Sequence, residues 1–463
     1  MKFLLCVLGL TLPLLGQAVQ TPAPSKDLLT EVFLRELVAQ AERGAAQAQL
    51  KLGQLYQAGK EVKQSDAEAY RWFAMAAQQN NAEAQLQQGW MDFFGKGVPA
   101  DRAAAARLYR AAADQGNASA QYHLGQCYLT GTCTEQDYGQ AQKWLRLSAE
   151  NGDMRGQTSA GYIYNNGYGV ERDYAEARRW YLLAASRGDS TSMYNLGVIY
   201  EYGNGVPQDY GLARTWLQRA ADAGDNTAFA RLGRLFAKGL GVKADPVQAV
   251  ALYRRAAELD DAFGQTLLGQ SYETGEGVGR DLAQARHWYE LAARGGDAEG
   301  QRRLGMLYDD AVGVKGDYKE AIRWFRLAAD QGDSEAQRRL AILYQAHGGE
   351  NVTMPVIWNY LTRAMDQGNM TAVADGGMFN LYDFDASNQG AASEAVKFFT
   401  RAAEAGNDVG QMRLGRAYSL GLGVVKDARL AQHWLSLAAR QGNADAIFFL
   451  KQIYDIEVKH PAH

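Results

Sequence analysis

The residues best suited to chemistry in this sequence are Cys127 and Cys133, which lie in the stretch QCYLTGTC. They are two of only three cysteines among 463 residues. Thiols at this spacing have four ordinary uses: a disulfide, a pair of metal ligands, a catalytic nucleophile, or two small buried hydrophobes. The compartment and the fold decide between them.

The N-terminus predicts export. Lys2 precedes an uncharged, leucine-rich run over residues 3–15, and the small-residue stretch GQA follows, which is the pattern of a cleaved secretory signal over residues 1–18. The run is too short for a stable membrane anchor, and Cys6 is expected to leave with it. Two cysteines then remain in a periplasmic or secreted protein, where thiols are not kept reduced, so a disulfide is favoured.

Composition and motifs argue against several classes of function. The formal net charge of -4 disfavours nucleic acid or an anionic membrane as the main partner, and no later segment is apolar enough to cross a membrane. The six histidines are scattered and form no HExxH or other clustered metal pattern. Neither GxSxG nor GxxxxGKS occurs. The sequence predicts no catalytic residue, no cofactor and no metal site.

The chain repeats itself with a period of 36 residues. Eleven repeats follow one another, and only the tenth differs in length, with 38 residues. Their bounds are 46–81, 82–117, 118–153, 154–189, 190–225, 226–261, 262–297, 298–333, 334–369, 370–407 and 408–443. Such a period indicates an array of stacked repeats rather than two to four globular domains.

Each repeat is explained as two helices and a turn. Every repeat ends in Asn or Asp, which is expected to cap the first helix of the next repeat. The loop GxGV turns the chain, and Asp173 with Glu176, like Asp317 with Glu320, has the capping-box pattern for the second helix. An Asp starts that helix at 101, 137, 173, 209, 245, 281, 317 and 427. The recurring Trp at 72, 144, 180, 216, 288, 324 and 434 is interpreted as core rather than as a ladder for ligand stacking, since it keeps one repeat position.

The cysteine pair has a definite place in this repeat. Cys127 takes the core-facing position of Leu55 and Ile199, and Cys133 replaces the second loop glycine, as at Gly205. A helix end and the loop returning over it can bring Cα atoms within the ~6 Å that a disulfide needs. The bond would stabilise by ~2 kcal/mol because the closed loop is short. The alternative is two free thiols, the buried one behaving as a small hydrophobe.

The period, the loop GxGVxxD and the spacing from Trp to a pair of alanines resemble Sel1-like repeats, a family related to tetratricopeptide repeats. The resemblance covers residues 46–443. It implies an all-α fold, a right-handed α/α solenoid of about eleven 36-residue helix-turn-helix repeats. Residues 19–45 would then hold a linker and a capping helix over 26–43, and residues 444–463 a C-terminal capping helix and tail.

The resemblance also implies that the first helices line the concave face of the solenoid. Two residues before the usual repeat glycine, this face carries Lys51, Gln87, His123, Ser159, Asn195, Arg231, Leu267, Arg303, Arg339, Asp375 and Arg413. With Arg302 and Arg338 beside it, the row is predicted to be basic between repeats six and nine and again at repeat eleven. A basic row suits an acidic partner segment or an anionic glycan. The alternative is a solvated polar face.

Two places depart from the repeat pattern. In the stretch GWMDFFGKG, Asp92 stands where other repeats carry Tyr or Phe, among Trp90, Phe93 and Phe94. These aromatics are candidates for a partner-binding hot spot, or Phe93 takes over the packing role of the missing Tyr. Repeats nine and ten diverge further, because Thr353 and Gln389 occupy cap positions and Tyr360 replaces Trp. This divergence is interpreted as a hinge, as a binding insert or as relaxed sequence.

The leading hypothesis is an exported, non-enzymatic scaffold that binds a protein partner on its concave face. By resemblance, exported relatives are mostly bacterial adaptors, some acting on envelope machinery and some binding host proteins, including secretory immunoglobulin A. The alternative is a cell-wall or β-lactam-binding or hydrolysing protein, because certain cysteine-rich relatives are assigned such behaviour. Those relatives carry a cysteine pair in most repeats, whereas this chain has one.

Overall fold

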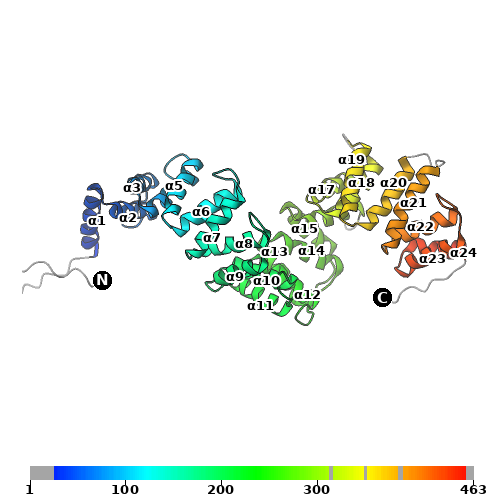
Figure 1. Cartoon of the computed structure of the whole chain (residues 1–463). Coiled ribbons are helices and arrows are strands. Elements are labelled where there is room, and N and C mark those ends of the chain that lie inside the picture. Colours follow the sequence, from blue (N-terminus) through cyan, green and yellow to red (C-terminus); the bar gives the residue numbers. More distant parts are fainter. Residues whose placement is uncertain (1–25, 312–315, 349–351, 384–388, 455–463) are drawn as a thin grey trace, which may run out of the picture. The chain divides into compact units, whose positions relative to one another are not determined.

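The regular structure of this chain is helical. A computed structural model describes residues 26–311, 316–348, 352–383 and 389–454, and every regular element in these ranges is an α-helix (Figure 1). The helices are α1 (Lys26–Glu42), α2 (Ala46–Ala58), α3 (Asp66–Gln78), α4 (Ala82–Phe94), α5 (Arg102–Asp114), α6 (Ala118–Thr130), α7 (Tyr138–Glu150), α8 (Met154–Asn166), α9 (Tyr174–Ala185), α10 (Ser190–Tyr202), α11 (Tyr210–Asp222), α12 (Thr227–Lys238), α13 (Pro246–Glu258), α14 (Ala262–Thr274), α15 (Leu282–Arg294), α16 (Ala298–Asp309), α17 (Tyr318–Asp330), α18 (Ser334–His347), α19 (Met354–Asp366), α20 (Met370–Asp383), α21 (Gln389–Glu404), α22 (Asp408–Leu420), α23 (Ala428–Arg440) and α24 (Ala444–Tyr454). The proposed signal segment, residues 1–18, lies outside the described residues.

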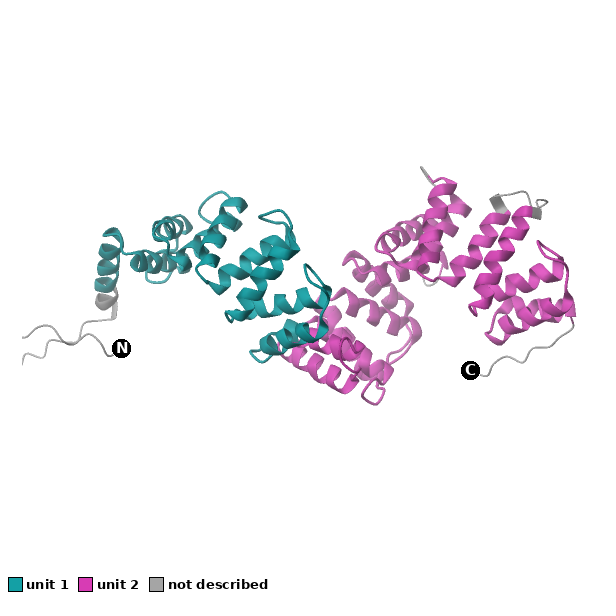
Figure 2. Cartoon of the chain, viewed as in Figure 1, with its two compact units in different colours: residues 1–192 teal, residues 193–463 magenta. Residues whose placement is uncertain are grey.

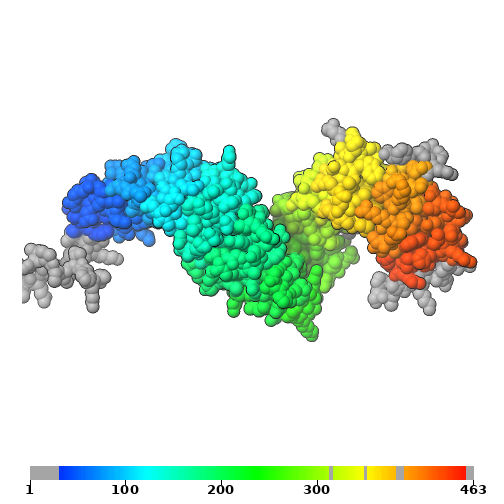
Figure 3. Space-filling model, in the orientation of Figure 1, coloured from blue at the N-terminus to red at the C-terminus, as the bar shows by residue number. Residues whose placement is uncertain are grey.

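The helices form two compact units, residues 1–192 and 193–463 (Figure 2). Within each unit, the two helices of a repeat pack as a hairpin, and the second helix packs on the first helix of the next repeat. Side chains fill the spaces between neighbouring helices of a unit (Figure 3). The predicted all-α repeat solenoid is confirmed.

Side-chain caps start the helices where the sequence places Asn and Asp. The Asn81 side chain accepts a hydrogen bond from the Ala84 N–H at 3.0 Å to cap a first helix, and Asp101 accepts from Ala104 at 2.8 Å to cap a second helix. All eight predicted Asp residues cap their second helices in this way. Each cap satisfies one of the N–H groups that the first helical turn leaves without a partner.

Two helix starts differ in detail from this common form. Helix α12 begins at Thr227, and Asp225 accepts hydrogen bonds from both the N–H and the hydroxyl of Thr227. In α9 only one half of the capping box forms, since the Glu176 carboxylate pairs with the Arg179 guanidinium instead of reaching back to the cap residue. A cationic partner one turn away competes successfully for that carboxylate.

The GxG loop is needed because it joins neighbouring repeats closely. Gly97 has a φ of 74°, and a Cβ there would meet the Asp66 carbonyl group of the preceding repeat at 2.5 Å. Only glycine combines this left-handed conformation with such a close approach. The loop therefore packs closely against the start of the second helix in the preceding repeat.

The core is built from one large and one small residue facing each other within each repeat. A Cβ at Gly161 would lie 2.6 Å from the Tyr181 ring, so the glycine lets that ring lie directly on the first helix. The interpretation of the tryptophans as core residues is confirmed, because Trp72, Trp144, Trp180 and Trp324 are buried and Trp216, Trp288 and Trp434 are half-buried.

A column of buried glutamines links the repeats. Gln301 donates a hydrogen bond to the Ala293 carbonyl at the end of the preceding second helix, at 3.1 Å, and accepts one from Gln331 of its own repeat at 2.9 Å. The same donation recurs eight residues back from Gln49, Gln85, Gln121, Gln157, Gln265, Gln301, Gln337 and Gln411, which we call the glutamine column. Each of these carbonyls also accepts a backbone N–H, as Ala293 does from Gly296 at 3.2 Å, so the glutamine supplies its second hydrogen bond and links two helices.

Replacing Gln301 by Ala tests the column. The change removes one of the two hydrogen bonds to the Ala293 carbonyl and one of those made by the Gln331 amide, while Gly296 remains a partner of both. We therefore expect a loss of about 0.5–1.5 kcal/mol in the free energy of unfolding, measured by urea denaturation. Gln284→Ala, at an exposed position of the neighbouring second helix, is the matched control and should leave the midpoint unchanged. Equal midpoints for both variants would contradict a stabilising column.

Candidate partner-binding surface

The predicted arginine row lies on first helices of the second compact unit. Arg231 comes from α12, Arg302 and Arg303 from α16, Arg338 and Arg339 from α18, and Arg413 from α22. Their side chains are only 14 to 29% exposed. Desolvation of this degree requires that each guanidinium finds an anionic or polar partner.

Acidic residues of the preceding repeat supply these partners at a constant spacing. Arg231 Nη1 lies 3.3 Å from Glu201 Oε2, Arg303 Nη1 3.5 Å from Glu273 Oε2, and Arg339 Nη1 2.9 Å from Asp309 Oδ2. In each pair the acid is 30 residues before the arginine. We call these pairs the rungs, since each connects the first helices of two neighbouring repeats.

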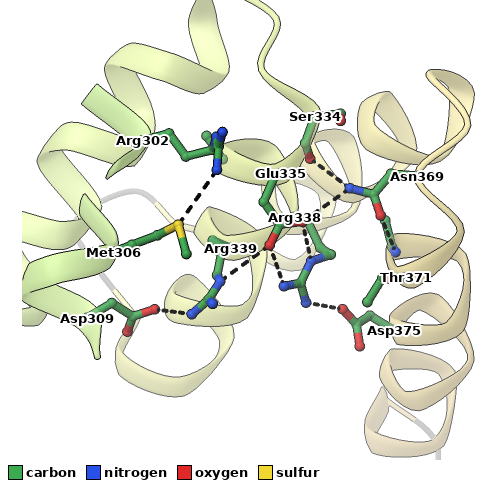
Figure 4. A network of polar contacts seen from close by, with 12 residues as sticks. Arg302, Met306, Asp309, Ser334, Glu335, Arg338, Arg339, Asn369, Thr371 and Asp375 are labelled. Carbon is green, nitrogen blue, oxygen red and sulfur yellow. Dashed lines mark hydrogen bonds and ion pairs between the residues drawn. The ribbon is translucent and has the colours of Figure 1, made fainter. Parts of the chain in front are cut away.

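Further carboxylates enclose the arginines beside the rungs, as Figure 4 shows. Arg302 pairs with Glu299 at 3.0 Å and with Asp333 at 3.1 Å. Arg338 pairs with Glu335 at 2.6 Å and reaches α20 to pair with Asp375 at 2.8 Å (Figure 4).

Asp375 takes the row position that arginine holds in the repeats on either side. Its carboxylate lies between two guanidinium groups, 2.8 Å from Arg338 and 2.8 Å from Arg413. The Asp375 side chain is 7% exposed. The acid therefore connects repeats nine, ten and eleven through one buried charge.

The predicted net-basic character of the row is wrong. The six arginines of the row and Arg234 pair with eight carboxylates, those of Glu201, Glu273, Glu299, Asp309, Asp310, Asp333, Glu335 and Asp375, so these groups carry a formal charge of 7 - 8 = -1. The prediction considers one column of the helices, whereas the acids lie in adjacent columns and in the neighbouring repeat. The recurrence of Glu201, Glu273 and Asp309 at one repeat position is the sequence signal that would have revealed them.

In the pair of Arg338 and Glu335, each partner shifts the pKa of the other in the direction that favours its charged form. Burial by itself lowers the pKa of the Arg338 guanidinium, but Glu335 and Asp375 outweigh burial and hold this pKa above its ordinary value. Burial likewise raises the pKa of Glu335, and the hydrogen bonds and charge of Arg338 reverse the effect, so the pKa of Glu335 lies below its ordinary value. The lowered pKa means that this contribution to stability is present above the ordinary glutamate pKa and is lost as the pH falls through the folded value.

The aromatic candidates lie together on α4 in the first compact unit. The ring centres of Trp90 and Phe94 are 5.0 Å apart, and those of Phe93 and Phe94 are 4.8 Å apart. Trp90 and Phe93 are half-buried and each packs against a core cluster, so the structure supports the repacking alternative for Phe93. Of the three, Phe94 is the exposed one, with 55% of its surface accessible.

Asp92 is buried beside these aromatics without a cationic partner in an ion pair among the described residues. It is 4% exposed, and the hydroxyl of Tyr70 is its hydrogen-bond partner. Burial raises the pKa of Asp92, helped by the charge of Asp101, and the Tyr70 hydrogen bond and Arg107 only partly offset the rise. The carboxylate occupies a position where other repeats place a ring.

The two cysteines are positioned as the sequence predicts. Their Cα atoms lie 5.2 Å apart, and the sulfur atoms are adjacent. Cys127 is buried in a core cluster and Cys133 packs against the same cluster from the loop. The distance lies within the range of disulfides, so the predicted bond needs no backbone movement.

Within the described ranges, no three His, Cys, Asp or Glu side chains gather in a way that would hold a metal ion. In the same ranges, no helix has both the length and the apolar character needed to span a bilayer.

Comparisons with known proteins bear on these surfaces. The profile of the Sel1 repeat matches residues 46–81, 82–117, 118–153, 155–189, 190–225, 229–261, 262–297, 298–333, 391–407 and 409–443, and leaves 334–390 unmatched. A solved protective antigen present in uropathogenic Escherichia coli strains, which displays an SLR fold, is 33% identical over 89% of this chain and 88% of that chain, with a TM-score of 0.63. A Sel1 repeat protein from Oxalobacter formigenes is 28% identical over 53% of this chain and 96% of its own, with a TM-score of 0.49. A comparison with curated proteins gave no match.

Alkylation tests the cysteine pair. We expect the purified chain, exported and kept free of reductant, to show no mass shift with iodoacetamide until it is reduced. Cys133→Ser should lower the free energy of unfolding by ~2 kcal/mol, since it reopens a short loop. A double alkylation before reduction would show that the thiols are free.

Replacing Asp92 tests the cost of its burial. A raised pKa in the folded state means that folding favours the protonated acid, so stability falls as the pH rises from the ordinary Asp value, about 3.9, through the folded value. Asp92→Asn should therefore raise the melting temperature at pH 7 and lose this advantage near pH 3. Asp137→Ala, which removes the cap of α7 at an exposed residue of another repeat, should lower the melting temperature at pH 7 instead. An Asp92→Asn advantage that does not depend on pH would contradict the raised pKa.

Proposed function

Since this chain belongs to the Sel1 repeat family, whose repeats serve protein interaction in general, we propose that it is an exported, non-enzymatic scaffold that binds a protein partner on the surface of its first helices. The partner is a host protein, such as secretory immunoglobulin A, or a complex of the bacterial envelope. The signal-like N-terminus supports export. The similar protein from uropathogenic Escherichia coli is described as a protective antigen, which agrees with a location accessible to a host.

The observation that carries the proposal is the contrast between constant and variable positions. Caps, loop glycines and core aromatics recur through the repeats because the fold requires them, and the glutamine column recurs in eight of them. The row position on the first helices holds Ser159, Leu267, Arg303 and Asp375 on the same scaffold. Folding does not require one residue type there, so this surface is where sequence is free to specify a partner.

The ion pairs prepare this surface for recognition. Arginines held by two or three carboxylates lose little conformational freedom when a partner arrives, which lowers the entropic cost of binding. Polar groups fixed in position also favour a partner with matching donors and acceptors over other proteins. The surface is thus suited to a polar, shape-specific contact rather than to attraction of any acidic protein.

Exchange of one rung tests the binding surface. The double variant Asp309→Arg with Arg339→Glu retains one opposite-charge pair between α16 and α18, reverses its direction, and replaces the ion pairs of Arg339 with Asp310 and Glu335 by like charges. We expect unchanged helical content and at least a tenfold weaker interaction with a partner isolated by the wild-type chain from envelope extracts or mucosal secretions.

The control exchanges an ion pair on a second helix. Glu176→Arg with Arg179→Glu reverses an exposed pair on α9 and should leave partner affinity unchanged. Equal affinity for the α16–α18 variant and the wild type would remove this part of the row from the binding surface. Hydrolysis of peptidoglycan or of a β-lactam by the purified chain would contradict the non-enzymatic assignment.

A further inference from the structure

At one place on the first-helix surface, an apolar pair of residues stands where the neighbouring helices have a rung. At the spacing that joins Glu201 to Arg231 and Glu273 to Arg303, the intermediate pair is Ala237 and Leu267. Neither side chain spans the gap that a glutamate and an arginine close together. The first helices α12 and α14 therefore lack the ion pair that the neighbouring helices share.

Next to this apolar pair, a small serine replaces the leucine that other repeats place in the core. Ser271 takes the core position that Leu235 and Leu307 hold in the adjacent repeats. Its hydroxyl donates to the Leu267 carbonyl within α14 at 3.0 Å, so its polar group is satisfied locally. The volume that a leucine would fill is left open next to Ala237 and Leu267.

The result is a groove of 410 Å³ with a mixed lining. Its apolar part consists of Ala237, Leu267, Phe263 and Pro246, with Tyr253 and Ser271 beside them, and its polar part of Arg234, Lys238, Gln270, Thr274, Glu276, Glu299 and Arg303. It lies within the second compact unit, on α12, α13 and α14, and α16 borders it. This volume is at the lower end of the range for specific ligand sites, and the mixed lining suits a peptide segment with one apolar side chain between charged ones.

The charged residues that line the groove indicate which charges a bound partner segment would carry beside its apolar side chain. Arg234 is held by Glu201, and Arg303 by Glu273 and Glu299. Lys238 and Glu276 also line the groove and are exposed, and neither joins an ion pair within the described residues. One cation and one anion are thus available to charges of a partner.

We propose that this groove, the apolar notch, binds a leucine- or phenylalanine-sized side chain of an extended partner segment that carries one acidic and one basic residue beside it. The apolar side chain fills the volume left by Ser271 and Ala237, and the flanking charges meet Lys238 and Glu276. The proposal rests on the scaffold function proposed above and specifies one contact of its partner.

Synthetic peptides test the notch directly. The probes are fluorescein-labelled peptides with the cores Asp-Gly-Leu-Gly-Lys and Lys-Gly-Leu-Gly-Asp, and the same cores with Ala for Leu, measured by fluorescence polarisation on the full chain. For at least one order of charges, we expect the Leu peptide to bind at least fivefold more tightly than its Ala counterpart. Equal binding of the Leu and Ala peptides in both orders would overturn the proposal.

A filling variant and a charge pair complete the test. Ser271→Leu restores the usual repeat residue, so the melting temperature should stay equal or rise, while the preference for Leu peptides is lost. Lys238→Glu should weaken binding at least threefold, whereas Lys243→Glu, the same change in the loop of that repeat, should not. Retained preference in Ser271→Leu, or equal effects of the two lysine changes, would overturn the notch.

The outcome separates this proposal from the scaffold function. A wild-type chain that captures a stoichiometric partner, with Ser271→Leu capturing it equally well, would refute the notch and leave the scaffold intact. Failure of the wild-type chain to bind any protein would refute the scaffold, whatever the peptides show.

Discussion

Hydrogen bonds from buried glutamines to helix-end carbonyls of the preceding helix are the contacts that organise most junctions of this fold. A second helix that packs against the next repeat hides its last carbonyls from water, and each carbonyl that the column reaches accepts both a backbone N–H and a glutamine amide. The glutamine column supplies this amide in eight repeats, while Met193, Phe229 and Val373 hold its position in repeats five, six and ten. Six of the eight glutamines accept a hydrogen bond from a Gln or Asn thirty residues further on. Because the donor lies on the first helix, the column also sets which face of that helix remains outside.

The face that remains outside carries no residue type common to all repeats, and its residues vary. Where acid and arginine coincide at the rung positions, they join neighbouring first helices through ion pairs. Where Ala237 and Leu267 coincide, the same geometry leaves an apolar groove. A charged rung and an apolar notch are thus two outcomes of one spacing, and both follow from residues thirty positions apart meeting across adjacent helices.

The diverged repeats show how much sequence change this arrangement tolerates. Residues 334–390 escape the repeat profile, yet α18, α19 and α20 keep the two-helix order. Thr353 starts α19 without a side-chain cap, and Val373 replaces the glutamine of the column. In the same region, Gln337 retains its bond to Ala329 and Asp375 pairs with arginines on both sides. Polar links across repeats persist here although the local signature of the repeat has faded.

The sequence by itself determined the helices, their caps, the loop glycines and the aromatic core, and it placed Cys127 beside Cys133. The contacts that fix those features lie within one repeat or between one repeat and the next, so the 36-residue period reveals them in the sequence. Only the tertiary structure decided the charge of the arginine row, the burial of Asp92 and the opening of the apolar notch. Each of these depends on which side chains face one another across separate helices, and that facing is set by packing and by the glutamine column. The residue types at one repeat position, compared along the sequence, do not show which side chains face one another across helices.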